Sequence, residues 1–340
     1  MISKFEETRL QSLFKAFAGK RIAVIGDVML DKYYWGVVSR ISPEAPVPVV
    51  EVAEETSHLG GAANVAHNIK TLNATPFIFG VVGNDIAGKE LRDLYRRLGI
   101  NEEGICVDNN RPTTVKTRVI AHNQHVVRVD HEVRSDIAHE TQGMLLGALQ
   151  NIITSLDGII LEDYNKGMLV QPFLQNVIGL AHKHDIPVMV DPKFRNFFEY
   201  KGVTVFKPNR KEMEDALGAK YTSDKQLEQG AQDLRKQLSC ENVLITLGAK
   251  GMLLCDKDGI GRVATQARNV ADVSGAGDTV IATLTVSYAS GATIREAAVI
   301  ANYAAGLVCE EVGIVPIQSD ALYKKIADDL FDPKPSEERI

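Results

Sequence analysis

Short apolar segments alternate with helical patterns along most of the chain, and this alternation constrains the fold more than any other feature of the sequence. The apolar segments span residues 21–27, 76–82, 157–163, 186–191, 203–207 and 242–248. Helical patterns lie between most of them, at residues 62–72, 87–98, 140–153, 170–184, 210–217 and 223–238. Strands that alternate with helices predict a mostly parallel sheet covered on both faces, a three-layer α/β/α fold. Ligands of such sheets bind at the carboxyl ends of the strands.

Two segments depart from this alternation. Residues 33–52 and 113–130 alternate apolar and polar side chains, and each has turn residues near its middle. This pattern is typical of antiparallel hairpins without helices. We therefore expect one domain over residues 1–330, in which these two segments form a small antiparallel sheet, the lid, over one end of the main sheet. The polar residues 331–340 are expected to form a loose tail.

Composition narrows the classes of protein that this chain can represent. Of its 340 residues 24% are charged, the net charge is −6, and no run of Lys or Arg stands out, which argues against a nucleic-acid surface. No apolar stretch approaches the roughly 18 residues of a membrane span, and the N-terminus resembles no signal peptide. The four cysteines are scattered and form no C-x-x-C pair, so we expect reduced thiols in a cytoplasmic protein.

The segment DVSGAGD (272–278) places small residues directly before a helical pattern. Gly275, Ala276 and Gly277 carry no bulky side chain, and the first N–H groups of a helix lack internal partners, so the segment predicts an anion-binding turn. Asp278 lies at the helix start, where a low pKa is expected. A carboxylate beside an anion site can take a proton from an attacking hydroxyl. The alternative is a flexible loop with Asp278 as a helix cap.

Two further motifs place polar residues at the predicted ligand edge. In HLGGAANVAHNI (58–69), Gly60 and Gly61 would let the backbone approach a sugar, and Asn64 would bind its hydroxyls. The alternative is that the two glycines form a tight turn and Asn64 is a local helix cap. In GDVMLD (26–31), Asp27 and Asp31 would accept hydrogen bonds from a polyol, although Asp27 could simply cap the segment that follows the strand.

The segment KPNRKEME (207–214) contains Asn209 and Glu212 at the spacing of a helix capping box, and that role alone could explain both residues. The alternative is that they lie near a hydrated Mg²⁺ ion that keeps most of its waters.

These motifs together resemble a known family. GGAANVAHNIKTLNATPFIFGVVGNDIAG (60–88) and NVADVSGAGDTVIATL (269–284) resemble the two signatures of the ribokinase-like (PfkB) carbohydrate kinases, and the resemblance extends over residues 21–317. Within this family, residues 39–52, 113–130, 162–167 and 191–193 resemble the D-glycero-β-D-manno-heptose-7-phosphate kinases, which include the kinase half of the bifunctional ADP-heptose synthesis enzyme. The resemblance implies transfer of the ATP γ-phosphoryl group to the anomeric hydroxyl of heptose 7-phosphate, giving the 1,7-bisphosphate.

The resemblance also implies roles for individual residues. Asp278 would be the catalytic base, and the N–H groups of Gly275, Ala276 and Gly277 would hold the γ-phosphoryl group. Sugar hydroxyls would contact Asp27, Asp31, Gly60, Gly61 and Asn64. The ATP phosphates and ribose would lie beside Asn209, Glu212, Thr246, Gly248 and Gly251, with Mg²⁺ held through water by Glu212 and Asn209. Asn302 would lie near the adenine, unless it is a polar residue on a helix surface. Asp272 and nearby carbonyls are candidates for a monovalent cation such as K⁺.

A phosphorylated sugar requires a local positive charge. Lys116 and Arg118 share one face of their predicted strand, and Arg128 returns opposite Arg118, so we expect these residues to bind the sugar phosphate. Exposed lid strands also carry such residues to discourage edge pairing, which is the alternative. Arg40 and Lys193 are further candidates. Asp163, which we place with the substrate-binding residues, and Lys166 and Asp191 follow strands at the same ligand edge without a defined role.

The chain departs from its relatives in two places and leaves alternative functions open. We find no H-x-G-H nucleotidyltransferase motif before Ile340, so we expect another polypeptide to supply that activity, and Val273-Ser274 stands where many relatives have Thr-Thr. Apolar lid strands such as PVPVVEV (46–52) predict a homodimer formed through the lids. The alternative functions are a kinase of another sugar, such as a fructose phosphate or ribose, and a catalytically silent sugar- or nucleotide-binding regulator. The first strand lacks G-x-G-x-x-G, which excludes a dinucleotide-dependent oxidoreductase.

Overall fold

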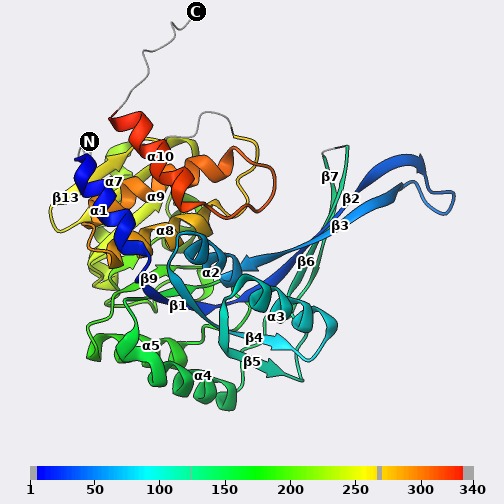
Figure 1. The fold of residues 1–340 in the computed structure, drawn as a ribbon, viewed down its shortest axis with the longest axis horizontal. Helices are drawn as coiled ribbons and strands as arrows, with labels where there is room; N and C mark the ends of the chain where they lie inside the picture. The colour runs from blue at the N-terminus through cyan, green and yellow to red at the C-terminus, as the bar shows by residue number, and fades with distance from the viewer. Residues whose placement is uncertain (1–5, 123, 266–269, 332–340) are drawn as a thin grey trace, which may run out of the picture.

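A large sheet forms the centre of the computed structural model, which describes residues 6–122, 124–265 and 270–331 (Figure 1). Within these residues its strand order is β13-β12-β11-β10-β9-β8-β1-β4-β5. The strands are β1 Arg21–Gly26, β4 Thr75–Gly83, β5 Asn101–Asp108, β8 Gly158–Glu162, β9 Val188–Asp191, β10 Val205–Phe206, β11 Asn242–Thr246, β12 Met252–Asp256 and β13 Gly259–Val263. Only the β11–β12 and β12–β13 pairs are antiparallel, so the predicted mostly parallel sheet is confirmed.

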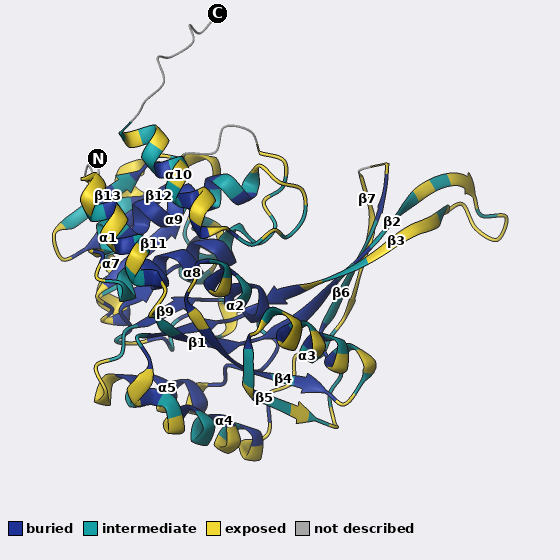
Figure 2. Cartoon of the chain, in the orientation of Figure 1, coloured by how far each residue is buried: buried dark blue, intermediate teal, exposed yellow. Residues whose placement is uncertain are grey.

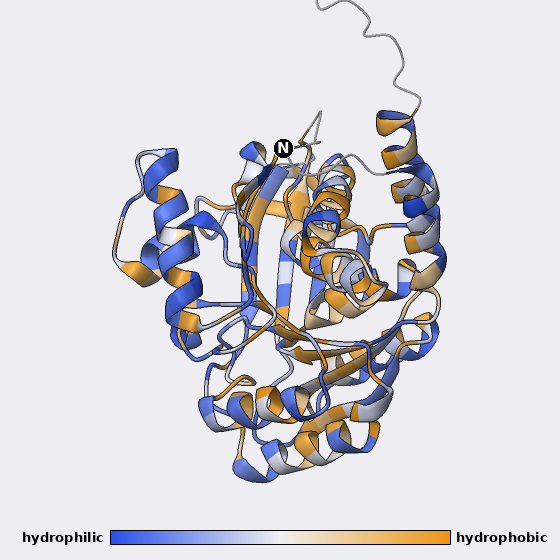
Figure 3. Ribbon diagram, turned by 90° about the vertical axis from the view of Figure 1, so that its left-hand side faces the viewer, coloured by the Kyte–Doolittle hydropathy of each residue, from blue (hydrophilic) through white to orange (hydrophobic). Residues whose placement is uncertain are grey.

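Helices cover both faces of this sheet. One layer contains α1 Glu7–Phe17, α2 Ala62–Thr71, α3 Ile86–Leu98, α8 Ala276–Ala289, α9 Ile294–Cys309 and α10 Ser319–Leu330, and the other contains α4 His139–Ile152, α5 Gln171–Lys183, α6 Arg210–Leu217 and α7 Asp224–Leu238. Side chains of β1 alternate between the layers: Ile22 and Val24 join the first apolar core, and Ala23 and Ile25 join the second. The central strands and helices are largely hydrophobic, whereas the peripheral helices carry more of the hydrophilic residues (Figure 3). The expected three-layer α/β/α fold is therefore confirmed.

A second, four-stranded sheet projects from the main body (Figure 1) and forms the predicted lid. Its order is β3-β2-β6-β7, with β2 Val28–Ile41, β3 Pro48–Gly61, β6 Val115–Ala121 and β7 Gln124–His131. The first hairpin is longer than the predicted residues 33–52. Strand β2 already begins within the motif GDVMLD (26–31), and β3 ends within the motif that begins HLGG (58–61). The two hairpins join through a parallel β2–β6 pairing that the sequence pattern did not predict. The outer parts of β2 and β3 are exposed (Figure 2).

The remaining differences from the predicted elements lie mainly at the edges. Strand β5 mixes charged and apolar residues because it is an edge strand, and the β12–β13 hairpin lacks the helix that accompanies the other strands. Strand β10 is limited to Val205–Phe206, although residues 203–207 were predicted. Short 3₁₀ helices occupy Ile153–Ser155, Phe194–Asn196 and Gly248–Lys250. The predicted loose tail, apart from Phe331, lies outside the described residues.

Across the described residues, none of the helices has the length and apolar character needed to cross a membrane.

Candidate active site

The carboxyl ends of three adjacent strands and the start of one helix bring the candidate catalytic groups together. Strand β1 ends at Gly26, β8 at Glu162 and β9 at Asp191, and the parallel register pairs Gly26 with Glu162 and Glu162 with Asp191. Helix α8 begins beside them at Ala276. Because parallel strands end at one edge of the sheet, residues far apart in sequence meet there, as predicted for a ligand edge.

The glycine-rich turn opens helix α8 without a side-chain cap. Gly275 is the N-cap residue and has a left-handed backbone conformation with φ 77, which favours glycine. A Cβ atom at Gly277 would lie 3.6 Å from Oδ2 of Asp191 and 3.8 Å from Nζ of Lys207, so this glycine faces the polar edge. The N–H group of Ala276 donates to the carbonyl of Val273 at 3.3 Å, within the turn itself. The predicted role of these amides in holding a phosphoryl group stays a prediction, and the uncapped helix start is compatible with it.

Asp278 lies beneath this turn and is 4% exposed. Its Oδ2 accepts a hydrogen bond from Nδ2 of Asn64 at 2.7 Å, and its Oδ1 accepts one from the hydroxyl of Tyr164 at 2.8 Å. Burial raises the pKa of Asp278 to about 6, although these two hydrogen bonds oppose the shift. The expected low pKa was therefore wrong, because loss of solvent outweighs the helix start. A carboxyl group that titrates near pH 6 suits a general base at neutral pH.

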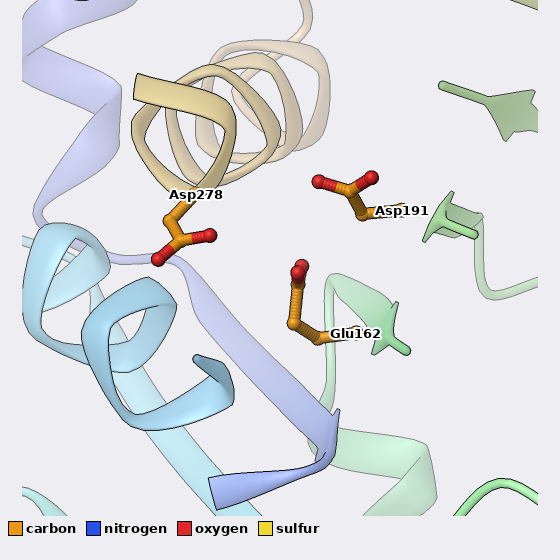
Figure 4. A group of neighbouring side chains, drawn as sticks. All are labelled: Glu162, Asp191 and Asp278. Carbon is orange, nitrogen blue, oxygen red and sulfur yellow. The ribbon is translucent and has the colours of Figure 1, made fainter. Parts of the chain in front are cut away.

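Two more carboxylates face Asp278. Glu162, Asp191 and Asp278 each place an oxygen within 4.8 Å of the others, and their side chains converge from two strands and a helix (Figure 4). Oδ2 of Asp191 pairs with Nζ of Lys207 at 2.7 Å, and both side chains are buried. Burial, followed by the charges of Asp191 and Asp278, holds the pKa of Glu162 well above its usual range.

Sequence reasoning missed Glu162, Tyr164 and Lys207 as site residues. The motif EDYNKG contained two of them, but Asp163 was chosen in place of its neighbour Glu162. Successive residues of a strand point to opposite faces, and nothing in the sequence says which face holds the ligand. Asp163 instead accepts hydrogen bonds from the Tyr200 hydroxyl at 2.7 Å and from the Asn165 N–H group at 2.7 Å. These partners give Asp163 a structural role in its loop.

Two adjoining cavities lie at this edge of the sheet, and the polar one is lined by Asp191 and Asp278. One has a volume of about 400 Å³ and a mostly apolar lining, to which Met252, Val280 and Ala305 contribute. The other has a volume of about 380 Å³ and is lined by Tyr164, Asp191, Lys193, Lys207, Asn209, Glu212 and Asp278. Both share Thr246, Gly248, Val273 and Gly277. An apolar cavity joined to a polar one can accept a flat ring and a charged chain from the same ligand.

The predicted nucleotide-binding residues line these cavities. Thr246, Gly248, Gly251 and Asn302 border the apolar one. Asn302 is buried and its Nδ2 donates to the carbonyl of Ala264 at 2.7 Å, so the alternative of a helix-surface residue was wrong.

Asn209 and Glu212 border the polar cavity and also form the predicted capping box of α6, with both hydrogen bonds 2.8 Å long. The second carboxylate oxygen of Glu212 pairs with Lys193. Asp272 accepts hydrogen bonds from the N–H groups of Ser274 at 2.9 Å and Gly313 at 3.1 Å, and thereby fastens the loop before α8.

The predicted sugar-binding residues hold the base of the lid together. Asp27 accepts hydrogen bonds from the N–H groups of Tyr164, Lys166 and Met168, so it anchors the loop that follows β8. Burial and the charge of Asp163 raise the pKa of Asp27 to about 6, although these bonds oppose the shift. The other predicted sugar ligands at the base of the lid are Asp31, Gly60 and Gly61. Asp31 is buried and forms an ion pair with Arg118. A Cβ atom at Gly60 would lie 2.1 Å from Oδ2 of Asp31, and Gly61 has φ +55.

Of the predicted phosphate-binding cations, Lys116 pairs with Asp130 at 3.2 Å. Lys166, for which the sequence predicted no role, pairs with Glu132 at 2.6 Å.

Arg118 and Arg128 are directly opposite in the β6–β7 register, as predicted, although Arg128 is exposed and pairs with Asp130. Arg40 lies on the exposed outer part of β2. Lys193 lines the polar cavity together with Asp278, whereas none of the lid cations lines that cavity.

Known proteins resemble this chain over most of its length. The model of the pfkB family carbohydrate kinases matches residues 20–320. A protein named Bifunctional protein HldE from Helicobacter pylori strain J99 is 42% identical over 294 residues, which are 86% of this chain and 64% of that protein. The HldE proteins of Desulfatibacillum aliphaticivorans and Wolinella succinogenes are 42% and 40% identical over 92% and 94% of this chain. The chain therefore spans about two thirds of the length of these relatives.

Solved structures share the fold at low sequence identity. Escherichia coli phosphofructokinase-2 in complex with potassium superposes with a TM-score of 0.76 at 18% identity, over 91% of this chain and 98% of that chain. Arabidopsis thaliana ribokinase complexed with ribose and ATP gives a TM-score of 0.72 at 18% identity, over 91% and 99% of the two chains. These similarities establish the ribokinase-like fold.

Proposed function

Because this chain belongs to the pfkB family of carbohydrate kinases, we propose that it phosphorylates the anomeric hydroxyl of D-glycero-D-manno-heptose 7-phosphate with ATP, in ADP-heptose biosynthesis. The choice of sugar rests on the lid and strand-end segments that resemble heptose-7-phosphate kinases. The identity of 40–42% to HldE proteins supports a close relation within the family. The observation that carries the chemistry is the buried carboxylate of Asp278 at the start of α8, beside a polar cavity.

Asp278 acts as the general base in this proposal. The hydrogen bonds from Asn64 and Tyr164 orient its carboxylate, so that it can take the proton of the attacking hydroxyl. In this proposal the backbone at Gly275 and Gly277 and the ammonium group of Lys207, which line the polar cavity, stabilise the negative charge that develops on the transferred phosphoryl group.

The two adjoining cavities accommodate ATP, with the adenine in the apolar one and the phosphates in the polar one. Asn209 and Glu212 line the polar cavity with their oxygens already hydrogen-bonded, so they fit a hydrated Mg²⁺ held through water. That ion supplies charge neutralisation to the ATP phosphates. Asp272 remains the proposed site of a monovalent cation.

The lid residues bind the phosphate of the sugar in this proposal. Lys116, Arg118 and Arg128 are joined by Lys166, whose side chain lies beside that of Lys116 through their common partner Glu132. We also propose that the protein is cytoplasmic. We further propose that it forms a homodimer through its lids, because β7 is exposed along its whole length.

Phosphorus NMR of the purified protein with MgATP tests this function. A new anomeric phosphate signal is expected with heptose 7-phosphate, and none with fructose 6-phosphate or ribose. Asp278→Asn should lower kcat by about 10²–10⁴, the usual contribution of a general base, with a much smaller change in KM.

The other outcomes of this experiment are distinct. Turnover of fructose 6-phosphate or ribose in place of the heptose would keep the kinase and reject the sugar. Retention of ATP without turnover of any sugar would reject the kinase in favour of a silent sugar- or nucleotide-binding regulator.

A further inference from the structure

Asp27 lies between β1 and β2, and its carboxylate binds the loop that follows β8. Oδ2 accepts hydrogen bonds from the N–H groups of Tyr164 at 2.8 Å and Lys166 at 3.0 Å, and Oδ1 accepts one from the N–H group of Met168 at 3.2 Å. Asp27 is 4% exposed. Three N–H groups that converge on one buried carboxylate form strong, charge-assisted bonds, so they fix every second residue of this loop.

Asp27 has little capacity left to bind a sugar. The cavity beside it has a volume of about 10 Å³, which holds one water molecule at most. Asp27 lines neither of the two larger cavities at this edge of the sheet. Its observed partners therefore favour a role toward the protein's own backbone over the contact with sugar hydroxyls that was predicted from the sequence.

The loop carries Tyr164, which joins Asp27 to Asp278. The N–H group of Tyr164 is bound by Asp27, and its hydroxyl donates to Oδ1 of Asp278 at 2.8 Å. Residues 163–170 belong to no helix or strand, so no regular ladder of backbone hydrogen bonds fixes the position of Tyr164. The carboxylate of Asp27 takes the place of such a ladder for this part of the chain.

We propose that Asp27 is a positioning residue, which holds this loop so that the hydroxyl of Tyr164 stays on the carboxylate of Asp278. Its effect on the reaction rests on the proposed function, in which Asp278 is the general base. Asn64 binds the other oxygen of that carboxylate at 2.7 Å. With both oxygens held, the carboxylate keeps one orientation toward an attacking hydroxyl, and loss of that orientation lowers the rate.

The titration of Asp278 reports whether the contact with Tyr164 is in place. The groups that face Asp278 from the neighbouring elements are Asn64, Glu162, Tyr164, Asp191 and Lys207. Burial has the largest effect on the pKa of Asp278 and raises it, whereas the bond from Tyr164 lowers it. Loss of this bond should therefore raise the pKa. Removal of the negative charge of Asp27 acts in the opposite direction, so a rise can be assigned to the lost contact.

Carbon-13 NMR of the purified protein, labelled at the aspartate carboxyl carbons, measures this titration without ATP or sugar. The signal of Asp278 is the one that disappears in Asp278→Asn. Tyr164→Phe should move its midpoint to higher pH by about one unit, because a hydrogen bond to a charged group contributes about that much. Asp27→Ala removes the acceptor of all three N–H groups and should produce a comparable shift.

The double variant Asp27→Ala/Tyr164→Phe separates positioning from independent effects. If Asp27 acts through Tyr164, the double variant should show the shift of Tyr164→Phe alone. Shifts that add in the double variant would overturn the proposal, as would a wild-type midpoint in folded Asp27→Ala.

Asp256→Ala is the matched control for the loss of a buried carboxylate. Asp256 is also 4% exposed, accepts a hydrogen bond from the N–H group of Asp258 at 2.8 Å and pairs with Arg295 at 2.7 Å, but it lines neither large cavity. It should lower the melting temperature and leave the midpoint of Asp278 in place. Should Asp27→Ala not fold, Asp27→Ser replaces it with the same expected outcomes, because its oxygen stops one bond short of the carboxylate oxygens.

Turnover provides a second readout. Asp27→Ala should lower kcat about as much as Tyr164→Phe with little change in KM, whereas a higher KM at unchanged kcat would overturn the proposal in favour of a sugar ligand. The carboxyl titration needs no turnover, so the positioning role and the kinase function can fail separately.

Discussion

Asp278 experiences two opposing effects, burial and hydrogen bonding, whose balance sets the pH range in which the protein can act as a kinase. Burial is the larger effect and raises its pKa to about 6. A general base works only when deprotonated, so kcat/KM should fall about tenfold for each pH unit below pH 6. A pH profile of kcat/KM between pH 4.5 and 8 measures this limb. A rate that stays constant down to pH 4.5 would contradict the role of Asp278 as the base.

Tyr164 contributes to this balance and can be changed separately. Its hydroxyl donates to Oδ1 of Asp278 at 2.8 Å, and this bond lowers the pKa of the carboxyl group. Tyr164→Phe removes the bond and should therefore move the acid limb of kcat/KM to higher pH. Tyr303→Phe is the matched control, since Tyr303 lies in the first apolar core and should leave the limb in place. An unchanged limb in Tyr164→Phe would show that the bond has no influence on the base.

At the residue scale, sequence reasoning selected Asn64 and Asp278 but not their neighbours Glu162 and Lys207. Asn64 and Asp278 were predicted for different tasks, and the structure joins them by a hydrogen bond across 214 positions of sequence. The short motif around Asp278 was informative because a run of small residues directly before a helix leaves its first amides open to a ligand. Glu162 and Lys207 could not be chosen in this way, because their importance depends on which strands are neighbours and which face is buried.

At the scale of elements, the junction of β2 and β3 leaves no room for a side chain at Gly60. Gly60 lies opposite Met29 in the register, and a Cβ atom there would approach Oδ2 of Asp31 to 2.1 Å. Asp31 is buried and paired with Arg118, so it has little room to move. Gly60→Ala should lower the free energy of unfolding by about 1–3 kcal/mol, as overpacking does.

Urea unfolding of Gly60→Ala and of Gly143→Ala measures this effect against a matched control. Gly143 lies within helix α4, and an added Cβ atom there meets nothing within 4 Å. Gly143→Ala should raise the free energy of unfolding by about 0.5–1 kcal/mol, because alanine favours a helix interior. If both variants lose stability equally, the close contact at Gly60 is not the cause.

The sequence predicted the elements better than their ends. Apolar runs predicted most of the parallel strands, because a strand buried on both faces is apolar throughout. The bounds of the lid were harder to predict, because only Asp27 separates β1 of the main sheet from β2 of the lid. The parallel pairing of β2 with β6 joins two hairpins that are distant in sequence, and local periodicity carries no information on such a contact.

At the scale of the whole molecule, the lid combines an open edge with exposed apolar side chains. Strand β7 ends the lid sheet, and all eight of its residues are exposed. Val127 and Val129 are 49% and 56% exposed and, two residues apart, point to the same face of the strand. An edge of this kind invites pairing with another chain, and a second copy related by a two-fold axis offers the same edge.

We therefore expect a homodimer in sedimentation velocity at micromolar concentration. The double substitution of Val127 and Val129 by Lys should shift it to a monomer, because a charged edge strand resists pairing. Val312→Lys is the control, since Val312 is 64% exposed but lies outside the lid and should leave the dimer intact. A wild-type monomer would reject the dimer. A dimer that persists in the double variant would place the interface away from β7. If dissociation also lowers the affinity for sugar phosphate, then the second copy helps to hold the lid over the site.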